Sequence, residues 1–163
     1  MVTEGIYVFG GKDENGKVSN LMKILTFSNN KVLWEFPKIK GTPPSPRFGH
    51  TMLLYEKLGL LIIYGGTNGK SEDKVSMENP NHVFVFSLEL MAWMATLSVG
   101  KFPKSMRYNH AAAIMGDSLV IFGGLEAKTY ASDELLIADI GRSYFRIFVM
   151  NFFNRCNGID KKA

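Results

Sequence analysis

The sequence predicts an all-β fold made of about three units of four short strands. Three repeated features lead to this prediction: an apolar run that ends in a glycine pair, an Arg-x-x-His segment, and a later aromatic position. The glycine-pair runs cover residues 6–11, 60–66 and 119–124. The second glycine stands at position 11, 66 and 124, which gives spacings of 55 and 58 residues. A period of this size indicates a repeat architecture.

The Arg-x-x-His segment precedes the second and the third glycine pair. Arg47 and His50 form the first copy, and Arg107 and His110 form the second. Proline-bearing stretches lead into both copies, and proline keeps such a crossing extended because it fixes φ. An arginine can donate to several carbonyl oxygens at once, so these arginines are expected to tie neighbouring units together.

Each unit contains short apolar runs bounded by glycine, asparagine, serine or proline, which is the pattern of strands. The first unit lacks the run that would precede its glycine pair. The further predicted strands are residues 21–27, 31–36, 51–55, 83–88, 111–115 and 135–138. The aromatic position on the fourth run falls on Trp34, on Trp93 and, in the third unit, on Tyr144 or Phe145. No segment has a capped 3.6-residue apolar period, so helices are not expected.

Four-stranded sheets repeated around an axis make a β-propeller. The apolar residues with their glycine pair, the later tryptophan and the Pro-Arg-x-x-His segment together resemble the Kelch repeat. The resemblance covers residues 5–145 and implies a partial Kelch β-propeller of about three four-stranded blades, the first of them incomplete. The structural motif positions are Gly10, Gly11, Trp34, Arg47, His50, Gly65, Gly66, Trp93, Arg107, His110, Gly123 and Gly124.

These repeats divide the chain into a Kelch-repeat region, residues 1–145, and a divergent C-terminal tail, residues 146–163. The predicted units span about 5–36, 47–97 and 107–145. Propellers close with ~4–8 blades, and an open arc exposes sheet faces and edges. Two hypotheses therefore stay open. The chain is a fragment or truncated product of a longer propeller, or copies of it associate to complete one.

The composition argues against several classes of protein. Lys and Arg number 19 against 15 Asp and Glu, a formal net charge of +4, and no basic stripe with interleaved aromatics occurs, so no nucleic-acid partner is expected. No apolar stretch approaches the ~20 residues of a spanning helix, and no secretory signal pattern opens the sequence, so no membrane partner is expected. The single cysteine, Cys156, favours a reducing compartment. We expect a cytoplasmic location, with the nucleus left open.

No pattern points to catalysis or to a bound metal. Residues 65–71 resemble the end of a phosphate-binding loop, but Tyr64 stands where that motif needs glycine. The sequence has no Gly-x-Ser-x-Gly elbow. His50 and His110 recur at one repeat position in different units, which favours an architectural role over metal binding. We therefore expect no enzyme activity, no cofactor and no metal site.

The resemblance implies that the loops after the glycine pairs and the Arg-x-x-His segments gather at one binding face. By position, the candidate binding residues are Lys12, Asp13, Phe48, Thr67, Asn68, Lys70, Tyr108, Asn109, Glu126 and Lys128. We expect a protein–protein interaction module or scaffold with an unidentified protein partner. The alternative is an accessory or regulatory propeller of an enzyme, such as a Kelch-linked protein phosphatase, whose catalytic part lies outside this chain. A nonfunctional product of a truncated gene is a third hypothesis.

Overall fold

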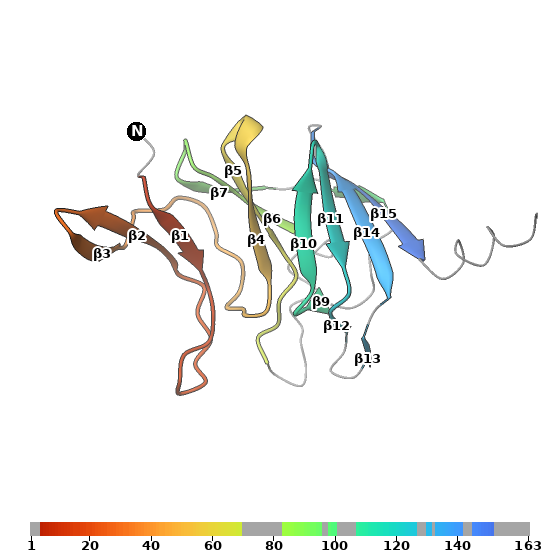
Figure 1. The fold of residues 1–163 in the computed structure, drawn as a ribbon, viewed down its shortest axis with the longest axis horizontal. Helices are drawn as coiled ribbons and strands as arrows, with labels where there is room; N and C mark the ends of the chain where they lie inside the picture. Colours follow the sequence, from red (N-terminus) through yellow and green to blue (C-terminus); the bar gives the residue numbers. More distant parts are fainter. Residues whose placement is uncertain are drawn as a thin grey trace, which may run out of the picture.

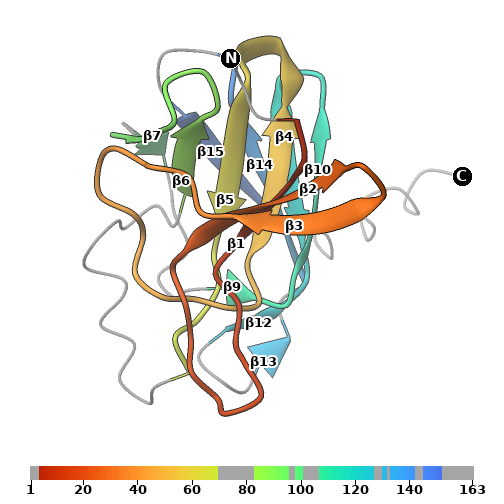
Figure 2. The ribbon, with the colours of Figure 1, turned by 90° about the vertical axis from the view of Figure 1, so that its left-hand side faces the viewer.

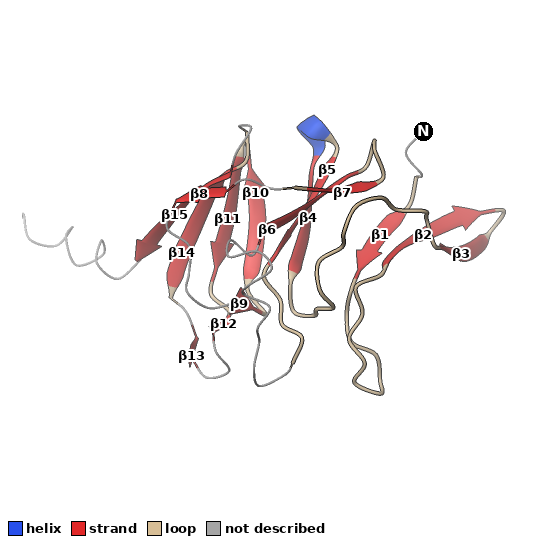
Figure 3. Cartoon of the chain, turned by 180° about the vertical axis from the view of Figure 1, so that it is seen from behind, coloured by secondary structure: helices blue, strands red, loops and turns tan. Residues whose placement is uncertain are grey.

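The fold is all-β, as the sequence predicts. The computed structural model describes residues 4–69, 83–95, 98–100, 107–126, 130–131, 133–141 and 145–151. In the short ranges 98–100, 130–131 and 145–151, only the backbone is described. Figure 3 shows that the regular structure of the described chain is almost entirely strand. The exception is one 3-10 turn, η1 (Glu56–Leu58), between two strands.

Unit 1 is a three-stranded antiparallel sheet in the order β1–β2–β3. Its strands are β1 (Ile6–Phe9), β2 (Met22–Ser28) and β3 (Lys31–Glu35). The turn between β2 and β3 places Asn29 and Asn30 at φ values of 48° and 60°. Two consecutive left-handed residues make the hairpin turn that matches the twist of the flanking strands, and asparagine tolerates that conformation.

Unit 2 is a complete four-stranded antiparallel sheet in the order β4–β5–β6–β7. Its strands are β4 (Thr51–Tyr55), β5 (Leu60–Tyr64), β6 (Val83–Ser87) and β7 (Ala92–Met94). Residues 61–64 of β5 are all buried. The uninterrupted apolar run of β5 is thus explained by its position, with a neighbouring sheet packed on each face.

Unit 3 has the same four antiparallel strands, in the order β10–β11–β14–β15. They are β10 (Ala111–Met115), β11 (Ser118–Phe122), β14 (Glu134–Asp139) and β15 (Phe145–Asn151). The predicted boundary at residue 145 therefore falls at the start of a strand that continues to Asn151. A small sheet in the order β13–β12–β9 lies at the end of this unit and consists of β13 (Tyr130–Ala131), β12 (Leu125–Glu126) and β9 (Arg107–Tyr108).

The predicted aromatic position of the third unit is wrong. Trp34 pairs with Leu25, and Trp93 pairs with Phe86, which is the corresponding residue of the next unit. In unit 3 the corresponding residue is Ala138, and its partner on β15 is Ile147. The tryptophan position thus falls on Ile147 and not on Tyr144 or Phe145. Tyr144 lies outside the described residues, and Phe145 is the first residue of β15.

The crossing between two units runs along the outer edge of the unit that it enters. Lys40 forms a parallel bridge with Ala92 of β7, with backbone hydrogen bonds of 3.0 Å to Met91 and from Trp93. In the next crossing, β8 (Ser98–Gly100) pairs in parallel with β15. These contacts cover the outer edges of units 2 and 3, which would otherwise be free to pair with other chains. The sequence did not predict them.

The three sheets stand side by side in chain order, with an apolar core at each of the two junctions (Figure 1). The first core joins units 1 and 2 and contains the buried residues Phe9, Met22, Leu61, Ile63, Phe86 and Trp93. The second joins units 2 and 3 and contains Tyr55, Ile62, Tyr64, Val83, Val85, Leu119, Ile121, Leu136, Ala138 and Ile140. Unit 2 thus packs one face of its sheet against unit 1 and the other against unit 3.

Candidate binding face

The glycine pairs allow the next unit to approach closely. Gly65 and Gly66 have φ values of 66° and 92°, in the left-handed region that favours glycine. A Cβ atom on Gly65 would overlap the carbonyl oxygen of Arg107, and the N–H of Gly66 donates to that same oxygen at 2.9 Å. The first glycine pair makes the same contacts with Arg47, again with a 2.9 Å hydrogen bond. The pair in one unit therefore holds the arginine backbone of the following unit.

Arg47 is completely buried, and the groups of the described residues that hold its guanidinium are neutral. Its Nη1 donates to the carbonyl oxygen of Gly65 at 2.9 Å. Its Nε donates to the carbonyl oxygen of Ser45 at 3.0 Å, and its Nη2 donates to the hydroxyl of the same residue at 2.9 Å. The guanidinium carbon lies 4.3 Å from the centre of the Phe84 ring, at cation–π distance.

Arg107 is equally buried, but its guanidinium is held by carboxylates. Its Nε donates to Glu126 Oε1 at 3.0 Å, and its Nη2 donates to the same oxygen at 2.5 Å. Nη2 also donates to Glu134 Oε2 at 2.8 Å, while Nη1 donates to the backbone carbonyl of Glu134 at 3.2 Å. Burial of this charge is compensated by two ion pairs, whose geometry is that of charge-assisted hydrogen bonds.

His50 and His110 both pack between units. The His50 ring meets Phe9 edge-on at 5.5 Å between centroids, and the His110 ring meets Tyr64 at 5.1 Å. His110 Nε2 also lies 2.9 Å from the hydroxyl of Thr51 on β4. Burial, reinforced by the neighbouring arginine, lowers the pKa of each histidine to about 4. Both side chains are therefore neutral near pH 7, and each packs as a neutral ring against an aromatic of the preceding unit, His50 against Phe9 and His110 against Tyr64.

Several of the candidate binding residues from units 1 and 2 come together. Phe48 and Thr67 exchange two backbone hydrogen bonds, of 3.0 and 2.9 Å. The Lys12 ammonium lies 5.4 Å from the centre of the Phe48 ring. Thr67 is only 6% exposed, so its side chain belongs to the packed interior. Asn68 is half-buried beside it.

The candidate residues of unit 3 extend the same end of the molecule. Tyr108 pairs with Leu125 across β9 and β12. Asn109 has a φ of 54°, and its N–H donates to the carbonyl oxygen of Gly49 at 2.7 Å, which links unit 3 to unit 2. Glu126 is engaged with Arg107, as described above. Two further candidates, Lys70 and Lys128, lie outside the described residues.

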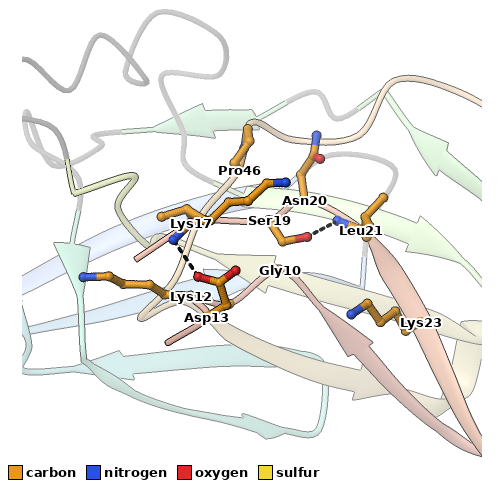
Figure 4. Close-up of a pocket in the computed structure, with 11 residues that line it drawn as sticks. Gly10, Lys12, Asp13, Lys17, Ser19, Asn20, Leu21, Lys23 and Pro46 are labelled. Atoms are coloured by element: carbon orange, nitrogen blue, oxygen red, sulfur yellow. Dashed lines mark hydrogen bonds between the residues drawn. The ribbon is translucent and has the colours of Figure 1, made fainter. Parts of the chain in front are cut away.

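Two pockets open between these loops. The first, of about 610 Å³, is lined by Gly10, Gly11, Lys12, Asp13, Lys17, Val18, Ser19, Asn20, Leu21, Lys23 and Pro46. Figure 4 shows that the stick side chains lining it come mainly from the loop between β1 and β2, in which Asp13 accepts from the Lys17 N–H at 2.7 Å. The second pocket, of about 490 Å³, is lined by Gly16, Lys17, Val18, Ser45, Pro46, Asn68 and Gly69.

Sequence reasoning missed Lys17 and Pro46, which line both pockets. A usable signal existed for Lys17 because it lies in the polar loop that follows the first glycine pair. Pro46 was interpreted only as part of an extended crossing. Within the described residues, no group of His, Cys, Asp and Glu side chains is arranged to hold a metal ion. No helix in that part of the chain is long and apolar enough to span a bilayer.

Comparisons with family models and with individual known proteins agree on one family. Residues 1–149 match the model of the KLHDC2/KLHL20/DRC7 Kelch-repeats domain. The chain is 29% identical over 132 residues to the Rab9 effector protein with kelch motifs of Xenopus laevis, covering 81% of this chain and 34% of that protein. It is 28% identical over 171 residues to Kelch domain-containing protein 2 of Bos taurus, covering 85% of this chain and 41% of that protein.

Two further similarities complete the comparison. A probable serine/threonine-protein kinase of Dictyostelium discoideum is 35% identical over 122 residues, which cover 72% of this chain and 8% of the kinase. The solved structure of YjhT superposes with a TM-score of 0.63 at 17% identity, over 91% of this chain and 49% of YjhT. The chain thus spans less than half the length of each of these proteins. With the repeated glycine pairs, buried arginines and stacked four-stranded sheets, these matches show that the chain is a β-propeller fragment and belongs to the Kelch-repeat family.

Proposed function

We propose that this chain is a protein-interaction module that binds its partner at the loop end of its Kelch units. The observation that supports the proposal is the continuity of that end across all three units. Lys12 of unit 1 lies over Phe48, which leads into unit 2, and Asn109, which leads into unit 3, donates to Gly49. Figure 1 shows the loop between β1 and β2 at the lower end of the sheets, the end at which β9 and β12 also lie.

The side chains at this end suit a protein partner. Phe48 and Tyr108 are half-buried aromatics, and Lys12 and Asp13 are exposed charges of opposite sign. Partly exposed aromatics next to charged groups are typical of the few residues that carry most of the energy of an interface. Asn68, on the wall of the 490 Å³ pocket, adds an amide that can both donate and accept.

Site-specific photo-crosslinking tests the proposal. A photoreactive amino acid is placed at Asn68 in one variant and at Glu56, in the exposed η1 turn at the other end of unit 2, in a control variant. We expect one discrete crosslinked protein with the Asn68 probe, and loss of that product when Phe48 and Tyr108 are both changed to Ala. Equal products from both probes, or a product that survives the double substitution, would contradict the proposal.

A second candidate function is that of an accessory module of an enzyme. The similarity to a Dictyostelium probable protein kinase favours it, because the matching segment makes up 8% of that long protein. Sequencing of the complete transcript that encodes this chain tests the candidate. A kinase or phosphatase domain in the same reading frame would support it, and a complete reading frame without an enzyme domain would contradict it.

A further inference from the structure

The crossing from unit 1 to unit 2 places a serine hydroxyl against a buried cation. Nη2 of Arg47 donates to Ser45 Oγ at 2.9 Å, and Nε of the same guanidinium donates to the Ser45 carbonyl oxygen at 3.0 Å. The Arg47 side chain is fully buried, whereas Ser45 is half-buried. A group attached to Ser45 Oγ would therefore lie within reach of an arginine that is already fixed in position.

The residues around this serine form a pattern that proline-directed protein kinases recognise. Ser45 is followed directly by Pro46, and Pro43 stands two residues before it. A residue that precedes proline is held in an extended conformation, and a kinase binds its substrate as an extended segment. Thr42 also precedes a proline. Of these two hydroxyls, that of Ser45 is the one that the described residues place on an arginine.

The crossing is open to such an enzyme. Gly41, Thr42, Pro43 and Pro46 are exposed, and residues 42–45 form no regular structure. Residues 42–46 include three prolines, which have no N–H to donate, so the segment can form few backbone hydrogen bonds. Figure 2 shows the crossing as a loop outside the strands that descends from β3 to the lower end of β4. Local opening of such a segment costs much less than unfolding of the sheets.

The space around Ser45 suits a phosphate. Ser45 lines the 490 Å³ pocket together with Lys17. A phosphoryl group replaces a few water molecules of about 30 Å³ each, so the pocket has room for it. Lys17 belongs to the loop between β1 and β2, and the Ser19 carbonyl of that loop accepts from the Arg47 N–H at 3.0 Å. This backbone contact keeps the loop with Lys17 beside the crossing.

Unit 3 shows that the same arginine position accepts anionic oxygens. In Arg107, which corresponds to Arg47, Nε and Nη2 both donate to the Glu126 carboxylate. In Arg47 the same two nitrogens both donate to Ser45. A phosphate on Ser45 would thus meet the two N–H groups that bind a carboxylate in unit 3. Arginine and phosphate form charge-assisted hydrogen bonds that are often bidentate.

We propose that Ser45 is a phosphorylation site of a proline-directed protein kinase and that Arg47 and Lys17 hold the phosphate. The transfer forms a bond between Ser45 Oγ and the γ-phosphorus of ATP and breaks the bond from that phosphorus to the β–γ bridging oxygen. The hydroxyl proton passes to a base of the kinase, and ADP leaves. The new group carries a charge of about −1.5 to −2 near pH 7 and joins Lys17 of unit 1 to Arg47 of unit 2.

This inference goes beyond the proposed function because neither the transfer nor the arginine contact needs a binding partner. Asn68 lines the same pocket, so the phosphate would also change the charge of the binding end, and that regulatory effect rests on the proposed function. The experiments below contain no partner protein. Their failure is therefore distinct from failure of the proposed function.

Phosphorylation of the purified full chain tests the site. The chain and a peptide of residues 38–52 are incubated with ATP and a purified mitogen-activated protein kinase, and tandem mass spectrometry locates the phosphate. We expect phosphate on Ser45 in both, and none at this position in the Ser45→Ala chain. Modification of the peptide but not of the folded chain would mean that the fold hides Ser45. Modification of neither would mean that the sequence is no substrate, and either result overturns the inference.

Phosphorus NMR of the full chain tests the contact with the arginine. Phosphoserine is installed during translation in place of Ser45 and, as matched control, in place of Thr42. A solvated phosphoserine has a second pKa of about 6, and we expect the second pKa at position 45 to lie about one unit below that at position 42. Equal values, or loss of the β-sheet circular dichroism in the position-45 form alone, would contradict a phosphate held by Arg47.

Two substitutions in the position-45 form locate the second cation. Lys17→Gln should raise the second pKa of the phosphate, because it removes one positive charge from the pocket. Lys38→Gln, at an exposed position of the same crossing, is the matched control and should leave this pKa unchanged. The same response to both substitutions would show that Lys17 does not hold the phosphate.

Discussion

Arg47 and Arg107 occupy the same position in successive units, but the described groups that hold their buried guanidinium charge differ. Both are fully buried, and the carbonyl oxygen of each accepts a 2.9 Å hydrogen bond from a glycine of the preceding unit. Among the described residues, the Arg47 guanidinium contacts serine and glycine oxygens and the Phe84 ring. The Arg107 guanidinium is satisfied by two carboxylates.

The comparison shows that the two junctions share the backbone contact between glycine pair and arginine, whereas the partners of the guanidinium vary. The backbone contact between glycine pair and arginine is the same in both junctions, because its geometry depends on the absence of a Cβ. The described groups that hold the guanidinium differ: Ser45, Gly65 and Phe84 for Arg47, and Glu126 and Glu134 for Arg107. Substitutions at the backbone contact should therefore be costly in both units, while substitutions of the arginines should be costly to different degrees.

Gly65→Ala should have the largest effect. The new Cβ would overlap the carbonyl oxygen of Arg107, and the φ of 66° adds backbone strain. We expect a loss of about 4 kcal/mol in the free energy of unfolding, measured by urea denaturation. Gly59→Ala is the control, because Gly59 has a φ of 60° but no described atom within 4 Å of its Cβ. Similar losses in both variants would show that strain, and not the close approach, decides the cost.

Arg107→Met should destabilise the protein more than Arg47→Met. Removal of Arg107 leaves Glu126 and Glu134 facing each other without their cation, which should cost about 4 kcal/mol. Removal of Arg47 leaves the neutral oxygen acceptors of the described residues Ser45 and Gly65 and should cost about 2 kcal/mol. Urea midpoints measure both. Adding Glu126→Gln and Glu134→Gln to Arg107→Met should recover part of the loss, and equal costs for the two arginines would remove the distinction between the junctions.

Acid should weaken both junctions through their histidines. The pKa of each histidine falls from 6.5 to about 4 in the folded state, so the unfolded state binds more protons between these values. Stability from this source is fully present above pH 6.5 and is lost as the pH falls toward 4, by about 3 kcal/mol for each histidine. Urea midpoints measured from pH 7 to pH 4 report it.

The contribution of one junction can be isolated. His110→Gln should remove about half of the pH dependence in this window and leave the part that comes from His50. A profile that is flat between pH 6.5 and 4 in the unsubstituted protein, or unchanged by His110→Gln, would contradict the burial of the neutral rings.

Thr51→Val should have the smallest effect and should act on one junction alone. The variant removes the hydroxyl that lies 2.9 Å from His110 Nε2, which should cost about 1 kcal/mol. His50 contacts Phe9 and not a residue of an inner strand. Thr51→Ser retains the hydroxyl and serves as control. If valine and serine cost the same in thermal unfolding, the hydroxyl contributes nothing to the junction.

The repeat and its strands could be predicted from the sequence because glycine pairs and apolar runs determine the local backbone conformation. The buried run of β5 and the asparagine turn after β2 follow from residue types alone. The third aromatic position was assigned to the wrong residues because it was chosen by residue type. Ile147 stands opposite Ala138 and follows it by nine residues, the same spacing as from Leu25 to Trp34 in unit 1. Only the register between two strands fixes such a position, and residue type does not encode it.

The candidate binding residues show the same limit. Position in the repeat placed Phe48 and Lys12 in loops, and the structure brings them into contact. Position could not reveal that Thr67 is buried or that Glu126 balances a buried arginine, since both depend on neighbours from other parts of the chain. Lys17 and Pro46 line the same pocket because the loop between β1 and β2 lies beside the crossing that leads into unit 2.

The backbone contact between Lys40 and Ala92 has a consequence for folding during synthesis of the chain. Ala92 follows Lys40 by about 50 residues, and ribosomes add about 5–20 residues per second. For some seconds after its own strands have emerged, the end of unit 1 has no edge to pair with. The crossing becomes fixed only when β7 has left the exit tunnel. Co-translational folding should therefore advance in steps of one blade, with the latest crossing always exposed to chaperones.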